Sequence, residues 1–174
     1  RDFSGIAPNF DEFAAGHSND TFGIGAVSST CSSPIVYDSQ TSDILTMSIS
    51  APYDTNHNLD LVNLDEFLTM AHDNGGYAEV IPGNLPTPYL NHLTQTWRFD
   101  QDDATGTDYI TDINLSFDLT GTGISTADET QFALAIDSTT QDGDFSDALF
   151  YSQGISVAGN IVSFTGVDIS DGDY

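Results

Sequence analysis

The residues of this chain whose types and spacing suit them to bind a ligand are aspartates and asparagines in two short segments. In the first, an Asp-Gly-Asp turn around Gly143 is flanked by further aspartates. Calcium takes about six to eight hard oxygen ligands on a flexible backbone, which aspartates at alternating or three-apart positions supply. The predicted calcium ligands are Asp137, Asp142, Asp144 and Asp147. A turn rich in Asp and Gly is also common without metal, so a plain polar turn is the alternative.

The second segment places oxygen-bearing side chains with the spacing of an EF-hand-type calcium loop when Asp54 is counted as the first position. The predicted ligands are Asp54, Asn56, Asn58, Asp60 and Asp65. Leu59 stands where such a loop has glycine, and Asp65 stands where it has a bidentate glutamate. A polar surface loop with an Asx-turn is the alternative interpretation of this segment.

Trp97 is the sole tryptophan and lies in an alternating segment, Leu93–Phe99. On a strand, Trp97 and Phe99 share one face while Arg98 points to the other. One interpretation makes Trp97 an aromatic platform that stacks sugar rings and binds a ligand. The other makes it a core residue of a β-sandwich, which the apolar pattern around it favours.

The chain has no recognisable catalytic constellation. General acid catalysis needs a carboxyl group whose pKa is raised by an apolar pocket, and no pattern singles out one acid among 27. The histidines show no zinc-binding spacing; they are His17, His57, His72 and His92. A single cysteine, Cys31, forms no internal disulfide and is interpreted as a small buried hydrophobe. The chain is therefore predicted not to be an enzyme.

The charge of the chain excludes whole classes of partner. Of its 174 residues 27 are acidic and 2 are basic, which gives a formal net charge of −25. Nucleic acids and anionic membrane surfaces are excluded because no basic stripe is present to neutralise phosphates. No apolar run reaches the roughly 20 residues of a spanning helix, so no membrane insertion is expected. At 39% hydrophobic residues the chain is expected to fold. Salt or bound cations must then offset its charge.

The elements that position these residues are predicted to be strands. In Ile113–Thr120 every odd position is apolar and every even one polar, the signature of a half-buried strand. Similar runs recur along the chain between clusters of Gly, Asn, Asp and Pro. We therefore predict an all-β antiparallel β-sandwich, immunoglobulin-like or jelly-roll-like. At most one short helix is expected, at Asn9–Ala15. Residues 1–20 would form an N-terminal arm or short helix and residues 21–174 a single β-sandwich domain. Because the chain begins at Arg1, it is interpreted as a processed product or an excised piece.

Several of these blocks together resemble a domain of large secreted adhesin-like surface proteins of marine and gliding Gram-negative bacteria. The blocks that carry the resemblance are Thr21–Gly25, Asp65–Gly75, Leu93–Phe99, Ile113–Leu119 and Phe132–Asp147. The resemblance implies an extracellular, non-catalytic β-sandwich and transfers no catalytic residues. It also implies a further apolar strand beyond Tyr174, where this chain stops.

Taken together, these patterns predict a non-catalytic structural or adhesive module at the cell surface, stabilised by calcium. It would belong to a tandem surface protein or be a repeating subunit of an extracellular filament joined by strand exchange through an open sheet edge. The expected partners are other copies of the chain, neighbouring surface domains and glycans. The alternatives are a carbohydrate-binding β-sandwich that uses Trp97 and, third, a hydrolase with paired acids.

Overall fold

The computed structural model describes residues 19–27, 35–37, 39–49, 66–80, 85, 87–89, 91–102, 112–138, 145 and 148–174. Across these residues the fold consists of antiparallel β-strands and a short 3-10 helix, Glu129–Gln131. The prediction of an all-β antiparallel sandwich is confirmed. The first strand begins at Asn19, close to the predicted start of the sandwich. The helix expected at Asn9–Ala15 lies outside the described residues.

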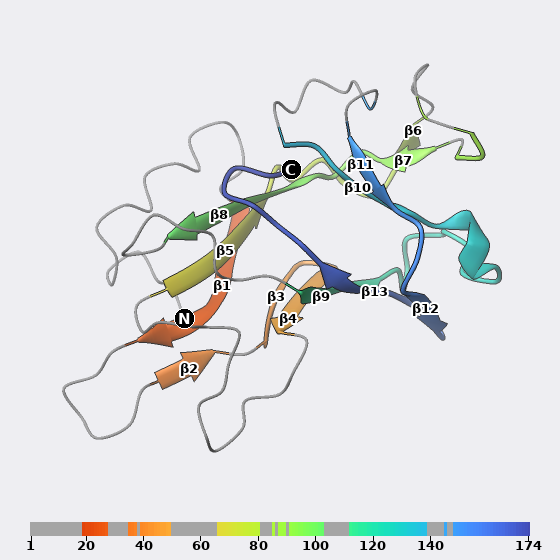
Figure 1. Ribbon diagram of the computed structural model, residues 1–174. Helices are drawn as coiled ribbons and strands as arrows, with labels where there is room; N and C mark the ends of the chain where they lie inside the picture. The colour runs from red at the N-terminus through yellow and green to blue at the C-terminus, as the bar shows by residue number, and fades with distance from the viewer. Residues whose placement is uncertain are drawn as a thin grey trace.

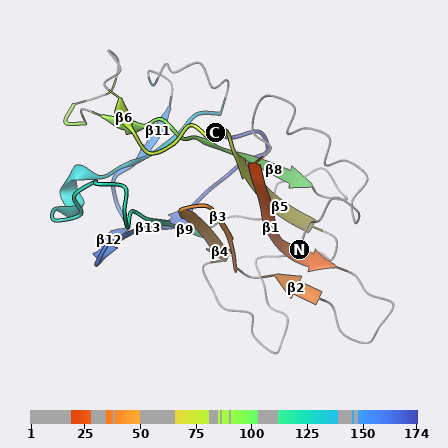
Figure 2. The same cartoon turned by 180° about the vertical axis from the view of Figure 1, so that it is seen from behind.

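Two larger sheets and two ribbons make up the fold (Figure 1). The four-stranded sheet has the order β2-β1-β5-β8, with β1 at Asn19–Val27, β2 at Ile35–Tyr37, β5 at Glu66–His72 and β8 at Trp97–Asp102. The five-stranded sheet has the order β12-β13-β9-β4-β3, with β3 at Ser39–Ser42, β4 at Leu45–Ile49, β9 at Ile113–Asp118, β12 at Ile155–Ala158 and β13 at Ile161–Val167. The ribbons pair β6 (Glu79–Val80) with β7 (His92–Leu93) and β10 (Leu134–Ile136) with β11 (Leu149–Tyr151). Figures 1 and 2 show both ribbons at the end of the molecule away from β2.

The five-stranded sheet has two contrasting faces because its strands alternate apolar and polar residues. Its inner face contributes buried side chains to the hydrophobic core, among them Leu45, Met47, Leu115, Val162 and Phe164. On its outer face the strand register aligns one row of hydroxyl residues across four strands: Ser156, Ser163, Ser116 and Thr46. Within this row the hydroxyl oxygens of Ser116 and Ser163 lie 2.8 Å apart. The outer face is therefore polar with few charges.

The four-stranded sheet is buried most deeply at its central strand, β5. Residues 68–71 are at most 1% exposed, so β5 is covered on both faces. Thr69 satisfies its hydroxyl by donating to the backbone oxygen of Asp100, at 3.1 Å. Strand β1 can approach β5 closely at Gly23, because a Cβ at that position would lie 2.6 Å from Thr69 Cγ2. A larger residue at position 23 would force β1 and β5 apart.

The last residues of the chain lie between β8 and β10. The Phe99 N–H donates to the Asp173 oxygen at 2.8 Å, and the Gly172 N–H donates to the Phe99 oxygen at 3.0 Å. On the other side, Asp137 and Tyr174 exchange two backbone hydrogen bonds of 2.9 and 3.0 Å. Figure 1 marks the C-terminus in this position between the four-stranded sheet and the ribbons. The C-terminal segment thus extends the four-stranded sheet toward β10.

The segment Leu93–Phe99, predicted as one strand, is divided in the structure into β7 and β8. The division occurs because donors between the two strands bind side chains and loops instead of a neighbouring strand. The carboxylate of Asp73 accepts from the backbone N–H of Thr96 at 3.2 Å and from its hydroxyl at 3.1 Å. The Thr94 hydroxyl donates to the backbone oxygens of Gly75 and Gly76.

Candidate functional site

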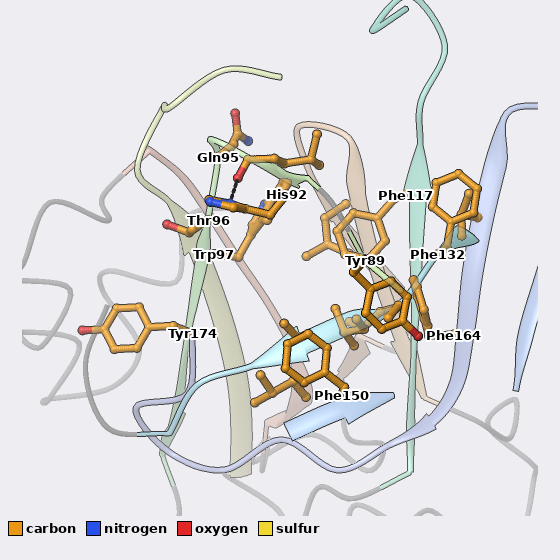
Figure 3. Close-up of a pocket in the computed structure, with 18 of the residues that line it drawn as sticks. Tyr89, His92, Gln95, Thr96, Trp97, Phe117, Phe132, Phe150, Phe164 and Tyr174 are labelled. Atoms are coloured by element: carbon orange, nitrogen blue, oxygen red, sulfur yellow. Dashed lines mark hydrogen bonds between the residues drawn. The ribbon is translucent and has the colours of Figure 1, made fainter. Parts of the chain in front are cut away.

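A cavity of about 510 Å³ lies between the inner face of the five-stranded sheet and a layer formed by β7, β8, β10 and β11 (Figure 3). Strands β9 and β13 supply one wall because their alternation turns Phe117 and Phe164 inward. Trp97 of β8, Phe132 before β10 and Phe150 of β11 supply other walls. Pockets that hold small ligands typically measure about 300–1,000 Å³ and are mostly apolar. The cavity has the size and lining of such a pocket.

The deep wall of the cavity is a chain of three aromatic rings. The rings of Trp97 and Phe117 meet edge to face with their centroids 5.5 Å apart, and those of Phe117 and Phe164 do so at 6.0 Å. Trp97 is 7% exposed, so the interpretation of Trp97 as a core residue is confirmed. Its Nε1 is buried and has no hydrogen-bond partner. Buried polar groups are nearly always paired, so this N–H is an exception, and it lies out of reach of the cavity.

A second group of rings, each half-buried, lines the cavity nearer its edge. Tyr89 and Phe150 stack almost in parallel, with an interplanar angle of 7° and centroids 5.9 Å apart. Phe145 contacts both Phe150 and His92, at centroid distances of 6.5 and 4.8 Å. The His92 Nδ1 lies 2.6 Å from the backbone oxygen of Leu93, the contact drawn as a dashed line in Figure 3. These rings join loops and ribbons that are distant in sequence.

Several polar side chains of the cavity wall already have protein partners. Gln95 is 4% exposed and donates from Nε2 to the carboxylate of Asp43 at 3.1 Å. The same carboxylate accepts from the Tyr77 hydroxyl, and Asp73 holds Thr96. Among the described lining residues, Asp137 is the one carboxylic acid and neither lysine nor arginine is present. The described wall thus shows no pair of facing acids.

Most of the predicted metal ligands lie outside the described residues. They are Asp142, Asp144, Asp147, Asp54, Asn56, Asn58, Asp60 and Asp65. Asp137 is described, and its backbone pairs with Tyr174 beside the cavity. Within the described part of the chain, no three His, Cys, Asp or Glu side chains gather as a metal site. Calcium binding stays a prediction.

Several described aspartates stabilise turns by binding the backbone N–H two residues ahead. Asp73 accepts from the Gly75 N–H at 2.9 Å, Asp118 from the Thr120 N–H at 3.0 Å and Asp128 from the Thr130 N–H at 3.0 Å. The hydroxyl and the backbone N–H of Thr120 lower the pKa of Asp118. The same two groups of Thr130 lower the pKa of Asp128. These are the Asx-turns that an Asp-rich chain is expected to contain.

The edge of the five-stranded sheet at β12 is open. In the described part of the chain, β12 pairs only with β13. The Thr165 N–H donates to the Gly154 oxygen at 3.3 Å, which identifies Gly154 and every second residue after it as the ones that hydrogen-bond to β13. Alternate residues of an antiparallel pair direct their backbone groups to the same neighbour. The N–H and C=O groups of Ile155 and Val157 are therefore directed away from β13, toward the open edge.

Comparison of this chain with protein-family models, with curated proteins and with solved structures gave no match. Among the described residues, no helix has the length and apolar character needed to cross a membrane. The functional interpretation consequently depends on the cavity, the sheet edges and the charge distribution of the chain itself.

Proposed function

We propose that this chain is a non-catalytic structural module outside the cell that associates with further copies, or with neighbouring surface domains, by strand addition at β12. The observation that carries the proposal is the open, uncharged edge of β12. A sheet edge with unpaired backbone groups is a template for another strand, and proteins usually block it with charge, proline or a covering segment. The sequence of β12, Ile-Ser-Val-Ala, has neither charge nor proline, and no described strand pairs with its outer side.

The distribution of charge supports the same surface. Residues 148–167, which contain β11, β12 and β13, include no Asp, Glu, Lys or Arg in a chain of net charge −25. Beside the edge, Ile161 is 42% exposed although it is a large apolar residue. Two acidic copies repel less where charge is sparse, so strands that carry none favour contact between copies.

The extracellular part of the proposal is supported by the composition and by the resemblance to adhesin-like surface domains. An aspartate-rich, lysine-free chain suits a medium that supplies salt or calcium to offset its charge. Trp97 is 7% exposed and therefore offers no surface platform for a sugar ring, which leaves the structural module as the function the geometry favours.

The proposal is tested by changing one backbone donor at the β12 edge. Val157→Pro removes an N–H directed to the open side, whereas Val157→Ala loses the side chain and keeps that N–H. Sedimentation velocity and electron microscopy, at high salt and with calcium, should show assembled wild type and Val157→Ala but monomeric Val157→Pro. A wild type that stays monomeric at every concentration, or a Val157→Pro variant that assembles like Val157→Ala, would contradict the proposal.

A second pair of variants covers the case in which Val157→Pro does not fold. Ser156→Lys places a charge on the exposed outer side of the edge strand, and Thr165→Lys places the same charge one strand further in. Both positions are exposed, so each variant should retain its stability to within about 0.5 kcal/mol. Assembly should be lost in Ser156→Lys and retained in Thr165→Lys. Equal loss in both would assign the contact to the sheet face rather than to the edge.

A further inference from the structure

We propose that the aromatic cavity is a binding site for an uncharged, mainly apolar small molecule. Protein interiors are normally close-packed, with few voids larger than a water molecule. The cavity of about 510 Å³ is partly open to solvent and has the size of a small-molecule pocket rather than of a packing void. Polar cavities hold water that makes several hydrogen bonds, but apolar walls give water few partners. An apolar molecule therefore fits this space better than solvent does.

The lining of the cavity selects against charge. No lysine or arginine is present among its described lining residues, so an anionic group would find no counter-charge there. The net charge of −25 further opposes the approach of an anion. Gln95 and Thr96 are already bonded to Asp43 and Asp73, so they offer little to a sugar with many hydroxyl groups. The site therefore favours a neutral ligand with few polar atoms.

Trp97 gives the site a reporter within its own wall. Its indole lines the cavity and is 7% exposed. Because Trp97 is the sole tryptophan of the chain, its fluorescence also reports directly on this wall.

The experiment uses the full chain and a neutral fluorescent probe, N-phenyl-1-naphthylamine. Titration should give a saturable rise in probe emission together with quenching of Trp97, since probe and indole would lie within one cavity. Ala133→Phe fills part of the cavity wall, and Ala127→Phe makes the same change at an exposed position outside it. We expect probe affinity to fall at least about tenfold in Ala133→Phe and to change less than about twofold in Ala127→Phe.

Competition with two compounds of equal chain length tests the charge of the ligand. Dodecanol should displace the probe at a concentration at least about tenfold lower than dodecanoate does. Equal displacement would overturn the preference for a neutral molecule. No saturable binding, or equal binding by Ala133→Phe and Ala127→Phe, would overturn the site itself. Thermal melting identifies a misfolded Ala133→Phe variant, in which case the smaller Ala135→Leu change repeats the test on β10.

This inference does not depend on assembly at β12. A Val157→Pro monomer should bind the probe as the wild type does, because Val157 is not among the residues that line the cavity. Loss of assembly with retained probe binding in Val157→Pro would separate the two proposals. Retained assembly with loss of probe binding in Ala133→Phe would do the same.

Discussion

The sheet edges at β8 and at β12 differ in charge and in what covers them. Strand β8 carries Arg98, Asp100 and Asp102, and its outer side is nevertheless covered by the C-terminal segment. Strand β12 carries no charge, and in the described part of the chain its outer side has no partner. An edge rich in charge already resists the addition of a foreign strand, whereas an uncharged edge does not. The comparison shows that covering an edge and charging it are separate devices here; β12 carries no charge, and no described strand covers its outer side.

Removal of the C-terminal segment that covers the edge of β8 should lower the stability of the fold more than any other change considered below. Deletion of residues 170–174 eliminates four backbone hydrogen bonds to Phe99 and Asp137. At about 1 kcal/mol each, we expect the free energy of unfolding to fall by about 4 kcal/mol. For a domain of this size the Tm should fall by roughly 8–16 °C, which circular dichroism would measure.

The control for this deletion is Tyr174→Ala, which keeps the backbone bonds and removes the ring whose centroid lies 5.7 Å from the Arg98 guanidinium. Its Tm should fall by much less than that of the deletion. A deletion variant with the Tm of the wild type would show that the C-terminal segment does not close the edge.

Calcium removal should have the next largest effect if the predicted loop at 137–147 holds an ion next to the closed edge. A ligand at a hundred times its Kd stabilises the folded state by about 2.7 kcal/mol, so chelation should lower the Tm by roughly 5–10 °C. Calorimetry at constant ionic strength separates this effect from general screening. A double variant, Asp142→Asn with Asp144→Asn, should no longer respond to the chelator. An unchanged wild-type Tm would assign the loop to plain turns.

Within the C-terminal segment, the burial of each aspartate should decide how much it contributes to the free energy of unfolding. Asp173 is 4% exposed and its Oδ2 accepts from the Ser170 N–H at 2.7 Å, so Asp173→Ala should cost about 2 kcal/mol. Asp171 is exposed and accepts from the Gln101 N–H at 3.1 Å, so Asp171→Ala should cost less than about 1 kcal/mol. Urea denaturation of the two variants tests this order. Equal losses would mean that burial does not decide the contribution, and no loss in either variant would mean that the segment is held by its backbone alone.

The smallest effect concerns the acids near the open edge. Asp118 pairs in register with Ile161 of β13, and Asp128 begins the 3-10 helix that follows β9. Since the pKa of each is lowered in the folded state, each favours folding above its unfolded pKa. That contribution is lost as the pH falls through the lowered folded pKa. The stabilising contribution of both acids should therefore stay constant near pH 7 and be lost only at acidic pH.

Carboxyl NMR titration measures these two pKa values directly. Thr120→Ala should raise the pKa of Asp118 and leave that of Asp128 unchanged, while Thr130→Ala should do the reverse, because each threonine supplies the bonds to one acid. A rise of both values in either variant would point to a shared electrostatic cause instead of local turns.

Much of the β-structure followed from alternation in the sequence. The strand predicted at Ile113–Thr120 contains β9, and β4 alternates over its whole length, because alternating burial leaves a direct mark on residue order. Two strands gave no usable pattern. Strand β3, Ser-Gln-Thr-Ser, has no apolar residue, and its place comes from pairing with β4. Strand β12 is short and becomes a strand through its hairpin with β13.

The cavity could not be predicted because its walls come from distant segments. Trp97, Phe117 and Phe164 belong to three strands that meet only after the two sheets pack. Tyr89 and Phe150 stack although about sixty residues of chain separate them. Sequence spacing reports faces within an element but carries no information on which elements oppose one another. The buried state of Trp97 was predictable because it depended on the pattern of its own strand.

The uncharged stretch from residue 148 to residue 167 has a consequence for how two molecules collide. The charge of −25 resides outside this stretch, so its strands add nothing to the repulsion between two copies. At low ionic strength repulsion between like-charged molecules slows their encounter and favours the orientations that bring the fewest charges together. If copies associate through β12 as proposed, added salt should therefore speed their encounter while making its orientation less selective.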